Sequence, residues 1–172
     1  ESELEKQRQK KWKKAWVFSI VVPAYETKEE FFLVLVDSLL EQTYPYWELV
    51  IADASSTDVV KCQCDKYEDK RIKYYALESN AGISENTNQG IEKATGDYIG
   101  LLDHDDYLTP DALYEMALAI EKGKEKNQEY GFLYSDEDKC DEYGKKFYDP
   151  HMKTDFNLDL FLTNNYICHF CV

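Results

Sequence analysis

The sequence lacks an apolar run that approaches the roughly 18 residues of a membrane-spanning helix, and no signal-peptide pattern opens the chain. Basic residues are scarce as well, because 20 Lys and Arg face 34 Asp and Glu, for a formal charge of −14. A nucleic-acid surface is recognised by a basic patch, so this balance argues against nucleic acid as a general partner. We therefore expect a cytoplasmic protein that does not bind nucleic acid.

The chain also lacks the cysteine content of a disulfide-rich domain, with five cysteines, an odd number. A secreted domain held together by disulfides carries a higher density of cysteines, usually in even number. The pairs Cys62 and Cys64, and Cys168 and Cys171, lack the paired-knuckle spacing of a zinc site. The sequence predicts reduced thiols, as in a cytosolic protein.

The chain does contain enough apolar material for a core, since 44% of its 172 residues are hydrophobic, and its length suits one domain. Residues 1–16 stand apart: six bases against three acids give this leader a charge of +3, while residues 17–172 carry −17. Trp12 and Trp16 would share one face of a helix. Two alternatives follow: a linker helix whose tryptophans dock on the domain, or an interfacial helix in peripheral contact with anionic lipid at the inner face of the membrane.

From Phe18 onward, short apolar runs typical of strands alternate with helical stretches. The expected strands are residues 18–22, 47–53, 71–77, 97–103 and 131–136. The expected helices are residues 28–42, 55–67 and 82–94, and a further one that opens at Pro110. This alternation predicts an α/β fold over residues 17–172, with a mainly parallel sheet and helices on both faces. Such sheets bind ligands at the carboxyl ends of their strands, near a topological switch point.

Three acids follow the fourth expected strand directly. Asp103, Asp105 and Asp106 come immediately after the apolar run Tyr98–Leu102, so they emerge together at the edge of the sheet. Carboxylates at such short distances repel one another. A divalent cation that prefers oxygen ligands, Mg²⁺ or Mn²⁺, relieves this repulsion. The alternative is that Asp105 and Asp106 merely precede and cap the helix near Pro110.

The runs SIVVPAYE, ELVIADASSTD and NAGISENTNQGIEKATGDYIGLLDHDD follow one another between residues 18 and 111. In this order and spacing they resemble the nucleotide-sugar-binding half of family-two glycosyltransferases, which have the Rossmann-like GT-A fold. The later runs YSDEDKCDEYG and DPHMKTDFNLDLFLTNNYICH are similar to enzymes of bacterial surface-polysaccharide assembly, such as rhamnan and O-antigen transferases. The resemblance implies a metal-dependent, inverting glycosyltransferase that moves a sugar from a UDP- or dTDP-linked donor to a saccharide or lipid-linked acceptor.

The resemblance also implies roles for residues at the strand ends. The residues that would bind the nucleotide sugar are Pro23, Tyr25, Glu26, Asp53, Asn80, Gly82, Asp103 and His104. Among them, Asp53 would accept the ring N–H of the base and Asp103 would lie near the ribose. Asp105 would coordinate the Mn²⁺ or Mg²⁺ that bridges the diphosphate, whereas His104 occupies a variable position of the motif.

The chain departs from the family pattern at two places. Ala54 and Ser55 stand where many members have Asp and Gly, and Thr87 stands where many have Arg, which leaves the nucleotide preference open. The family's catalytic base lies many tens of residues beyond the metal motif. We therefore expect the base beyond Val172, in a domain truncated at its C-terminus, with Asp138 as a weaker candidate inside the chain.

Two other functions compete with this interpretation. A non-catalytic nucleotide-sugar binding module would account for the missing base. A phosphatase of the haloacid dehalogenase type carries an Asp-x-Asp motif, but that motif should follow the first strand, whereas here it follows the fourth.

Overall fold

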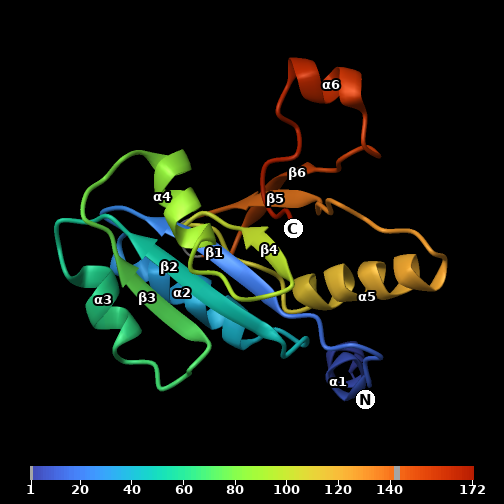
Figure 1. Cartoon of the computed structure of the whole chain (residues 1–172), viewed down its shortest axis with the longest axis horizontal. Coiled ribbons are helices and arrows are strands. Elements are labelled where there is room, and N and C mark those ends of the chain that lie inside the picture. Colours follow the sequence, from blue (N-terminus) through green and yellow to red (C-terminus); the bar gives the residue numbers. More distant parts are fainter. Residues whose placement is uncertain (1, 142–143) are drawn as a thin grey trace.

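The computed structural model describes residues 2–141 and 144–172 (Figure 1). The helices within these residues are α1 (Glu3–Gln9), α2 (Glu29–Leu40), α3 (Val59–Cys64), α4 (Ile83–Ile91), α5 (Ala112–Glu125) and α6 (Leu158–Thr163). The strands are β1 (Phe18–Ala24), β2 (Trp47–Asp53), β3 (Ile72–Ala76), β4 (Tyr98–Leu101), β5 (Glu137–Cys140) and β6 (Phe147–His151). No helix of the described chain is both long enough and apolar enough to cross a membrane.

The central sheet has four parallel strands in the order β3-β2-β1-β4. Strand β2 is buried along its whole length, as the apolar run at residues 49–52 predicts for a strand covered on both faces. Its last residue, Asp53, lies in register with Ala24 of β1 and Ala76 of β3. The carboxyl ends of these three strands therefore meet at the same edge of the sheet.

Helices cover both faces of this sheet, as the sequence predicts (Figure 1). On one face, Ile20 and Val22 of β1 are fully buried in the core that also contains α2 and α5. On the other face α4 packs against β1 and β2. A Cβ atom on Gly90 of α4 would come within 2.7 Å of Val21 and 3.2 Å of Ala52, so the missing side chain lets this helix approach the sheet closely.

The prediction of a strand at residues 131–136 is wrong. This segment forms only an isolated antiparallel bridge, from Tyr134 to Cys171, and β5 starts later, at Glu137. Cys171 also bridges Leu101 of β4, so the C-terminal segment lies between β4 and Tyr134. The parallel sheet ends at β4 because an antiparallel neighbour from the end of the chain occupies its free edge. Strands β5 and β6 instead form a separate antiparallel hairpin.

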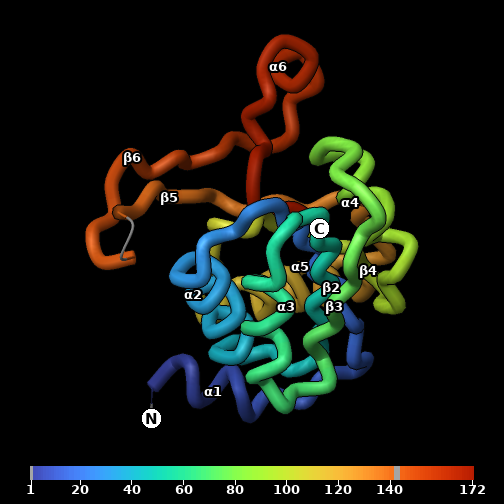
Figure 2. Tube along the Cα trace, turned by 90° about the vertical axis from the view of Figure 1, so that its left-hand side faces the viewer, coloured from blue at the N-terminus to red at the C-terminus, as the bar shows by residue number. Residues whose placement is uncertain are grey.

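The leader packs on the domain, but not as one helix. Helix α1 ends at Gln9, so Trp12 and Trp16 lie beyond it, and the expectation that they share a helix face is wrong. The ring of Trp12 makes edge-to-face contacts with Tyr44 and Tyr114, with centroids 4.9 and 5.2 Å apart. Both tryptophans pack against the main core, as in the first of the two alternatives above. The β5–β6 hairpin and α6, in contrast, project away from the sheet (Figure 2).

Candidate functional site

The predicted nucleotide-binding residues follow the ends of the parallel strands. The strand order places the loops after β3, β2, β1 and β4 next to one another, in that sequence along the edge. The order reverses between β1 and β4, which makes the crevice between these two strands the switch point where α/β sheets bind ligands. Tyr25 and Glu26 follow β1, and Asp103 follows β4, so they flank this crevice.

Asp53 is held in place through both carboxylate oxygens. Its side chain is buried, with the residue only 3% exposed. Oδ1 accepts hydrogen bonds from the backbone N–H and the hydroxyl of Ser55, at 3.0 and 2.5 Å, and Oδ2 accepts one from the hydroxyl of Tyr74 at 3.0 Å. Burial, followed by the charge of Asp53, raises the pKa of Tyr74 above its ordinary value, so Tyr74 stays a donor. These bonds fix one orientation of the Asp53 carboxylate at the strand end.

Ser55 ties the loop after β2 to the loop after β1. Its Oγ accepts a hydrogen bond from the backbone N–H of Glu26 at 2.8 Å while donating to Asp53. The Glu26 carboxylate in turn accepts bonds from the backbone and hydroxyl of Ser56, both at 2.8 Å, which lower the pKa of Glu26. Glu26 therefore bridges the loops after β1 and β2. Tyr25, beside it, is half exposed, so a ligand can reach its side chain.

The loop after β3 is shaped by Asn80 and Gly82. The Asn80 Oδ1 atom accepts hydrogen bonds from the Gly82 backbone and from the Asn86 side chain, each at 3.0 Å. Gly82 has a φ of +91°, a left-handed conformation that favours glycine, and open space surrounds the position that a Cβ would take. Thr87, at the position where many family members have Arg, bonds its own helix through the carbonyl of Ile83. This loop leaves backbone exposed at the same edge of the sheet.

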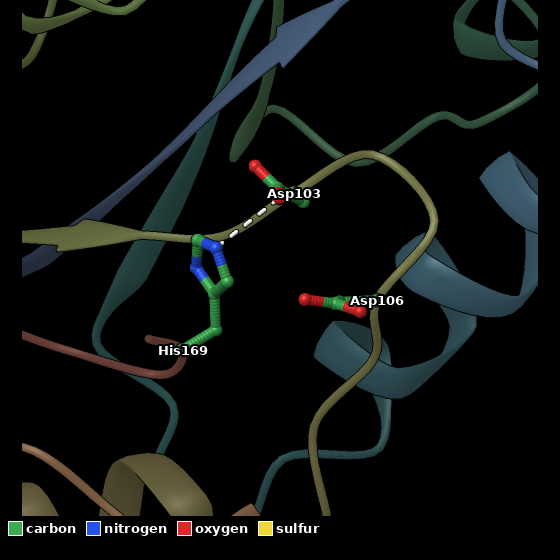
Figure 3. Close-up of side chains that lie close together, drawn as sticks. All are labelled: Asp103, Asp106 and His169. Atoms are coloured by element: carbon green, nitrogen blue, oxygen red, sulfur yellow. Dashed lines mark ion pairs between the residues drawn. The ribbon is translucent and has the colours of Figure 1, made fainter. Parts of the chain in front are cut away.

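Asp103, Asp106 and His169 come together at the end of β4 (Figure 3). One ligand atom from each lies within 4.8 Å of the others, and the His169 Nε2 atom lies 3.1 Å from Asp103 Oδ2. Asp103 and Asp106 come from the loop between β4 and α5, whereas His169 arrives from the C-terminal segment. A hydrogen bond from His169 lowers the pKa of Asp103, and the same bond raises that of His169.

The group carries more negative charge than one imidazole balances. Burial raises the pKa of Asp106, and the nearby carboxylates of Asp103 and Asp105 add to this rise against the opposing charge of His169. A divalent cation would relieve that repulsion. The two carboxylates supply oxygen ligands that suit Mn²⁺, and the imidazole of His169 is a third donor. The residues present therefore fit the cation that the resemblance implies.

Asp105 itself is exposed and does not belong to this group, so its role as metal ligand stays a prediction. The capping alternative is wrong, because the N-cap of α5 is Asp111. His104 is partly buried, and its Nδ1 atom has no hydrogen-bond partner in the described part of the chain.

A cleft of about 1010 Å³ opens next to this group, between the β4–α5 loop, the β5–β6 hairpin and the C-terminal segment. Its lining includes Asp103, Asp105, Asp106, His169, Asp138 and Glu137. Tyr25 and Asp53, which are predicted to bind the nucleoside, are not part of this lining, so the cleft lies beside the carboxylates and apart from these predicted contacts. The weaker candidate base Asp138 is exposed on the hairpin.

Sequence reasoning missed three features of this region. It counted Asp106 in the acidic cluster but named only Asp105 as a ligand of the cation. It also did not pair His169 with Asp103, and it gave Tyr74 no part in holding Asp53. No pattern in the sequence indicates the antiparallel pairing that brings His169 to this place.

Comparisons with known proteins bear on the family and the fold of the chain. Residues 19–172 match the glycosyl transferase family 2 sequence model. The uncharacterized protein y4gI of Sinorhizobium fredii is 38% identical over 156 residues, which cover 89% of this chain and 17% of that protein. The O-antigen biosynthesis protein RfbC of Myxococcus xanthus is 31% identical over 159 residues, covering 91% of this chain and 12% of RfbC. The chain thus spans less than a fifth of the length of these relatives.

Among solved structures, residues 1–349 of Staphylococcus aureus TarS have a similar fold, with a TM-score of 0.58 and 32% identity over 62% of this chain and 33% of that chain. A second TarS structure, in complex with UDP-GlcNAc, gives a TM-score of 0.55 at 28% identity, over 62% of this chain and 32% of that one. The parallel sheet with helices on both faces is thus that of a GT-A glycosyltransferase domain. The chain belongs to glycosyl transferase family 2.

Proposed function

We propose that this chain forms the donor-binding part of a metal-dependent, inverting glycosyltransferase of cell-surface polysaccharide biosynthesis. The donor is a UDP- or dTDP-linked sugar, and the acceptor is a saccharide or a lipid-linked saccharide. The observation that carries the proposal is the group of Asp103, Asp106 and His169 beside the switch-point crevice. The TarS complex with UDP-GlcNAc supports a UDP-linked donor.

In this proposal the strand ends bind the nucleoside. Asp53 accepts the ring N–H of the base, and its orientation is fixed before the nucleoside arrives, because Ser55 and Tyr74 donate hydrogen bonds to its two oxygens. The exposed ring of Tyr25 offers a face to the base. The loop at Gly82 lets its backbone approach the nucleotide.

Asp103, Asp106 and His169 would hold the cation, with exposed Asp105 reaching it from the rim. Mn²⁺ or Mg²⁺ at this place supplies positive charge for the diphosphate, whose negative charge grows as it leaves. Without such a charge, a chain with a formal charge of −14 would repel the leaving group.

The cleft beside the group has room for an acceptor saccharide. The acceptor hydroxyl attacks the anomeric carbon, the bond from that carbon to the diphosphate oxygen breaks, and attack from the opposite face inverts the configuration. A general base must take the hydroxyl proton. We place this base outside residues 1–172, and keep exposed Asp138 as the weaker candidate.

Two alternatives remain distinguishable. A non-catalytic binding module would bind the nucleotide sugar without turnover, even in a protein of the relatives' full length. The phosphatase alternative loses support because the acidic motif follows β4 and the chain belongs to a glycosyltransferase family.

A thermal-shift screen of nucleotide sugars, each with and without Mn²⁺, tests the proposal, because a ligand that binds the folded state raises the melting temperature. We expect UDP- or dTDP-linked sugars to raise it only with the cation, and Asp53→Ala to weaken the effect. Asp65→Asn, a change at the exposed C-cap of α3, serves as the control. Equal shifts for all nucleotides, or none, would overturn the proposal.

A further inference from the structure

Lys153 carries a buried charge that the proposed chemistry does not use. Its side chain is only 1% exposed. The Nζ atom donates to the Glu137 carboxylate at 3.1 Å, to the backbone carbonyl of His169 at 2.8 Å, and to the carbonyl of Ile167. An ammonium group has three N–H donors, so every donor of Lys153 is used. Such complete pairing is what a buried charge needs to be tolerated.

The partners of Lys153 come from separate parts of the chain. Glu137 begins β5, Lys153 follows β6, and Ile167 and His169 belong to the C-terminal segment. The backbone N–H of Lys153 adds a bond to the Asp136 carboxylate at 2.7 Å. Lys153 therefore fastens the base of the hairpin to the C-terminal segment.

His169 connects these contacts of Lys153 to the group of Asp103, Asp106 and His169, which we call the strand-end group. Its carbonyl accepts from Lys153, while its imidazole Nε2 lies 3.1 Å from the Asp103 carboxylate. On the other side, Phe170 is buried in the core and Cys171 pairs with Leu101 of β4. The backbone of His169 is thus held from both directions, and its imidazole has little freedom to leave Asp103.

We propose that Lys153 is a positioning residue: by binding the carbonyls of Ile167 and His169 it keeps the imidazole of His169 against Asp103, and so sets the affinity of the strand-end group for a divalent cation. The inference rests on the proposed function, because it assumes that this group binds a cation. Residues that orient a metal ligand without touching the metal change metal affinity by about 10-fold to 100-fold when they are replaced.

The test is a calorimetric titration of the chain with Mn²⁺ alone, for the wild type, Lys153→Met and Lys61→Met. Lys61 is the control because it also has a carboxylate partner, Asp65 at 2.7 Å, but is exposed and lies on α3. We expect Lys153→Met to weaken Mn²⁺ binding about 10-fold or more and Lys61→Met to leave it unchanged. Equal affinity of Lys153→Met and the wild type would overturn the inference and leave the proposed function intact. A wild type that does not bind Mn²⁺ would overturn both.

A double-mutant cycle separates positioning from a general loss of structure. If Lys153 acts through His169, Lys153→Met should weaken Mn²⁺ binding far less in a His169→Ala background than in the wild type. Additive losses would contradict the inference. Should Lys153→Met fail to fold, Lys153→Gln, which keeps two donors, takes its place. In either variant the imidazole ¹⁵N resonances of His169 should shift; unchanged His169 resonances would also contradict the inference.

Discussion

The Nε2 atom of His169 lies 3.1 Å from Oδ2 of Asp103, so the C-terminal segment contributes a side chain to the end of a central strand. The same segment pairs with that strand, since Cys171 bridges Leu101 of β4. A change that pushes the segment away from β4 must therefore also move the imidazole away from Asp103. The packing of the C-terminal segment on β4 therefore also determines where the imidazole lies in the candidate cation site.

Gly100 of β4 offers a test of this coupling. A Cβ atom there would lie 2.8 Å from the ring of Phe170 and 2.8 Å from Ile20, so Gly100→Ala overpacks the contact between strand and segment. We expect a loss of about 1 to 3 kcal/mol in the free energy of unfolding and weaker Mn²⁺ binding. Gly131→Ala, where nothing lies within 4 Å, is the control and should change neither. Chemical denaturation and calorimetry measure the two effects, and unaltered Mn²⁺ affinity in a destabilised Gly100→Ala would contradict the coupling.

Tyr74 supplies a second test, on the nucleoside side. Tyr74→Phe removes the hydrogen bond to Asp53 Oδ2 and leaves the ring in place, so Asp53 loses one of its supports. We expect about 1 kcal/mol less stability, and an affinity for UDP lower by several-fold. Tyr67→Phe is the matched control, because the Tyr67 hydroxyl also donates a hydrogen bond to a carboxylate, at 3.2 Å, but that carboxylate belongs to Asp37 of α2 and not to Asp53. Loss of UDP affinity in both variants alike would show that Asp53 has no special part in binding.

Glu48 predicts a pH dependence of stability. Burial alone would raise its pKa, but hydrogen bonds from Lys73, Ser19 and Thr95 outweigh burial and lower the pKa to about 2. Because the pKa is lower in the folded state, the ionised Glu48 stabilises the fold above its ordinary pKa of 4.5. This stabilisation is lost as the pH falls from 4.5 towards about 2.

Glu48→Gln should remove that part of the acid sensitivity and cost about 1 to 3 kcal/mol at neutral pH. Unfolding by urea at several pH values between 3 and 7 measures both quantities. An unchanged pH profile in the variant would contradict the assignment. Glu68→Gln, a change at an exposed position, is the control.

The leader should contribute to stability through Trp12. Trp12→Ala removes two edge-to-face contacts, with Tyr44 and Tyr114, and part of a core contact, so we expect about 2 kcal/mol less stability or more. Lys11→Ala, an exposed neighbour, should have almost no effect. If thermal unfolding shows the same stability for Trp12→Ala and the wild type, the docking interpretation fails.

The four parallel strands were predictable because each is a short apolar run bounded by polar or turn residues, a local signal. The helices α2, α4 and α5 were also predictable from a local signal, the helical pattern of the stretches between the strands. Their ends were less predictable: α5 begins at Ala112 rather than at Pro110. The error at residues 131–136 has a different origin. Its partner Cys171 comes from the end of the chain, and no local pattern encodes such a pairing.

The same distinction holds for the site. Asp103 and Asp106 were predictable as a cluster because they directly follow the strand that presents them. The partner His169 was not, since its place depends on the non-local pairing of Cys171 with Leu101. Ser55 looked like a departure from the family pattern, yet its hydroxyl joins Asp53 to Glu26 and shapes the crevice.

The most direct test is calorimetry of UDP binding with and without Mn²⁺, on the wild type, Asp103→Asn, Asp106→Asn and Asp105→Asn, with Asp65→Asn as the control. We expect UDP to bind the wild type and the control at least about 10-fold more tightly with Mn²⁺, and Asp103→Asn and Asp106→Asn to abolish this gain. The result for Asp105→Asn decides whether the exposed carboxylate also reaches the cation. Mn²⁺-independent binding of UDP, equal in all these variants, would contradict the central claim that the carboxylates at the end of β4 hold a cation for the diphosphate.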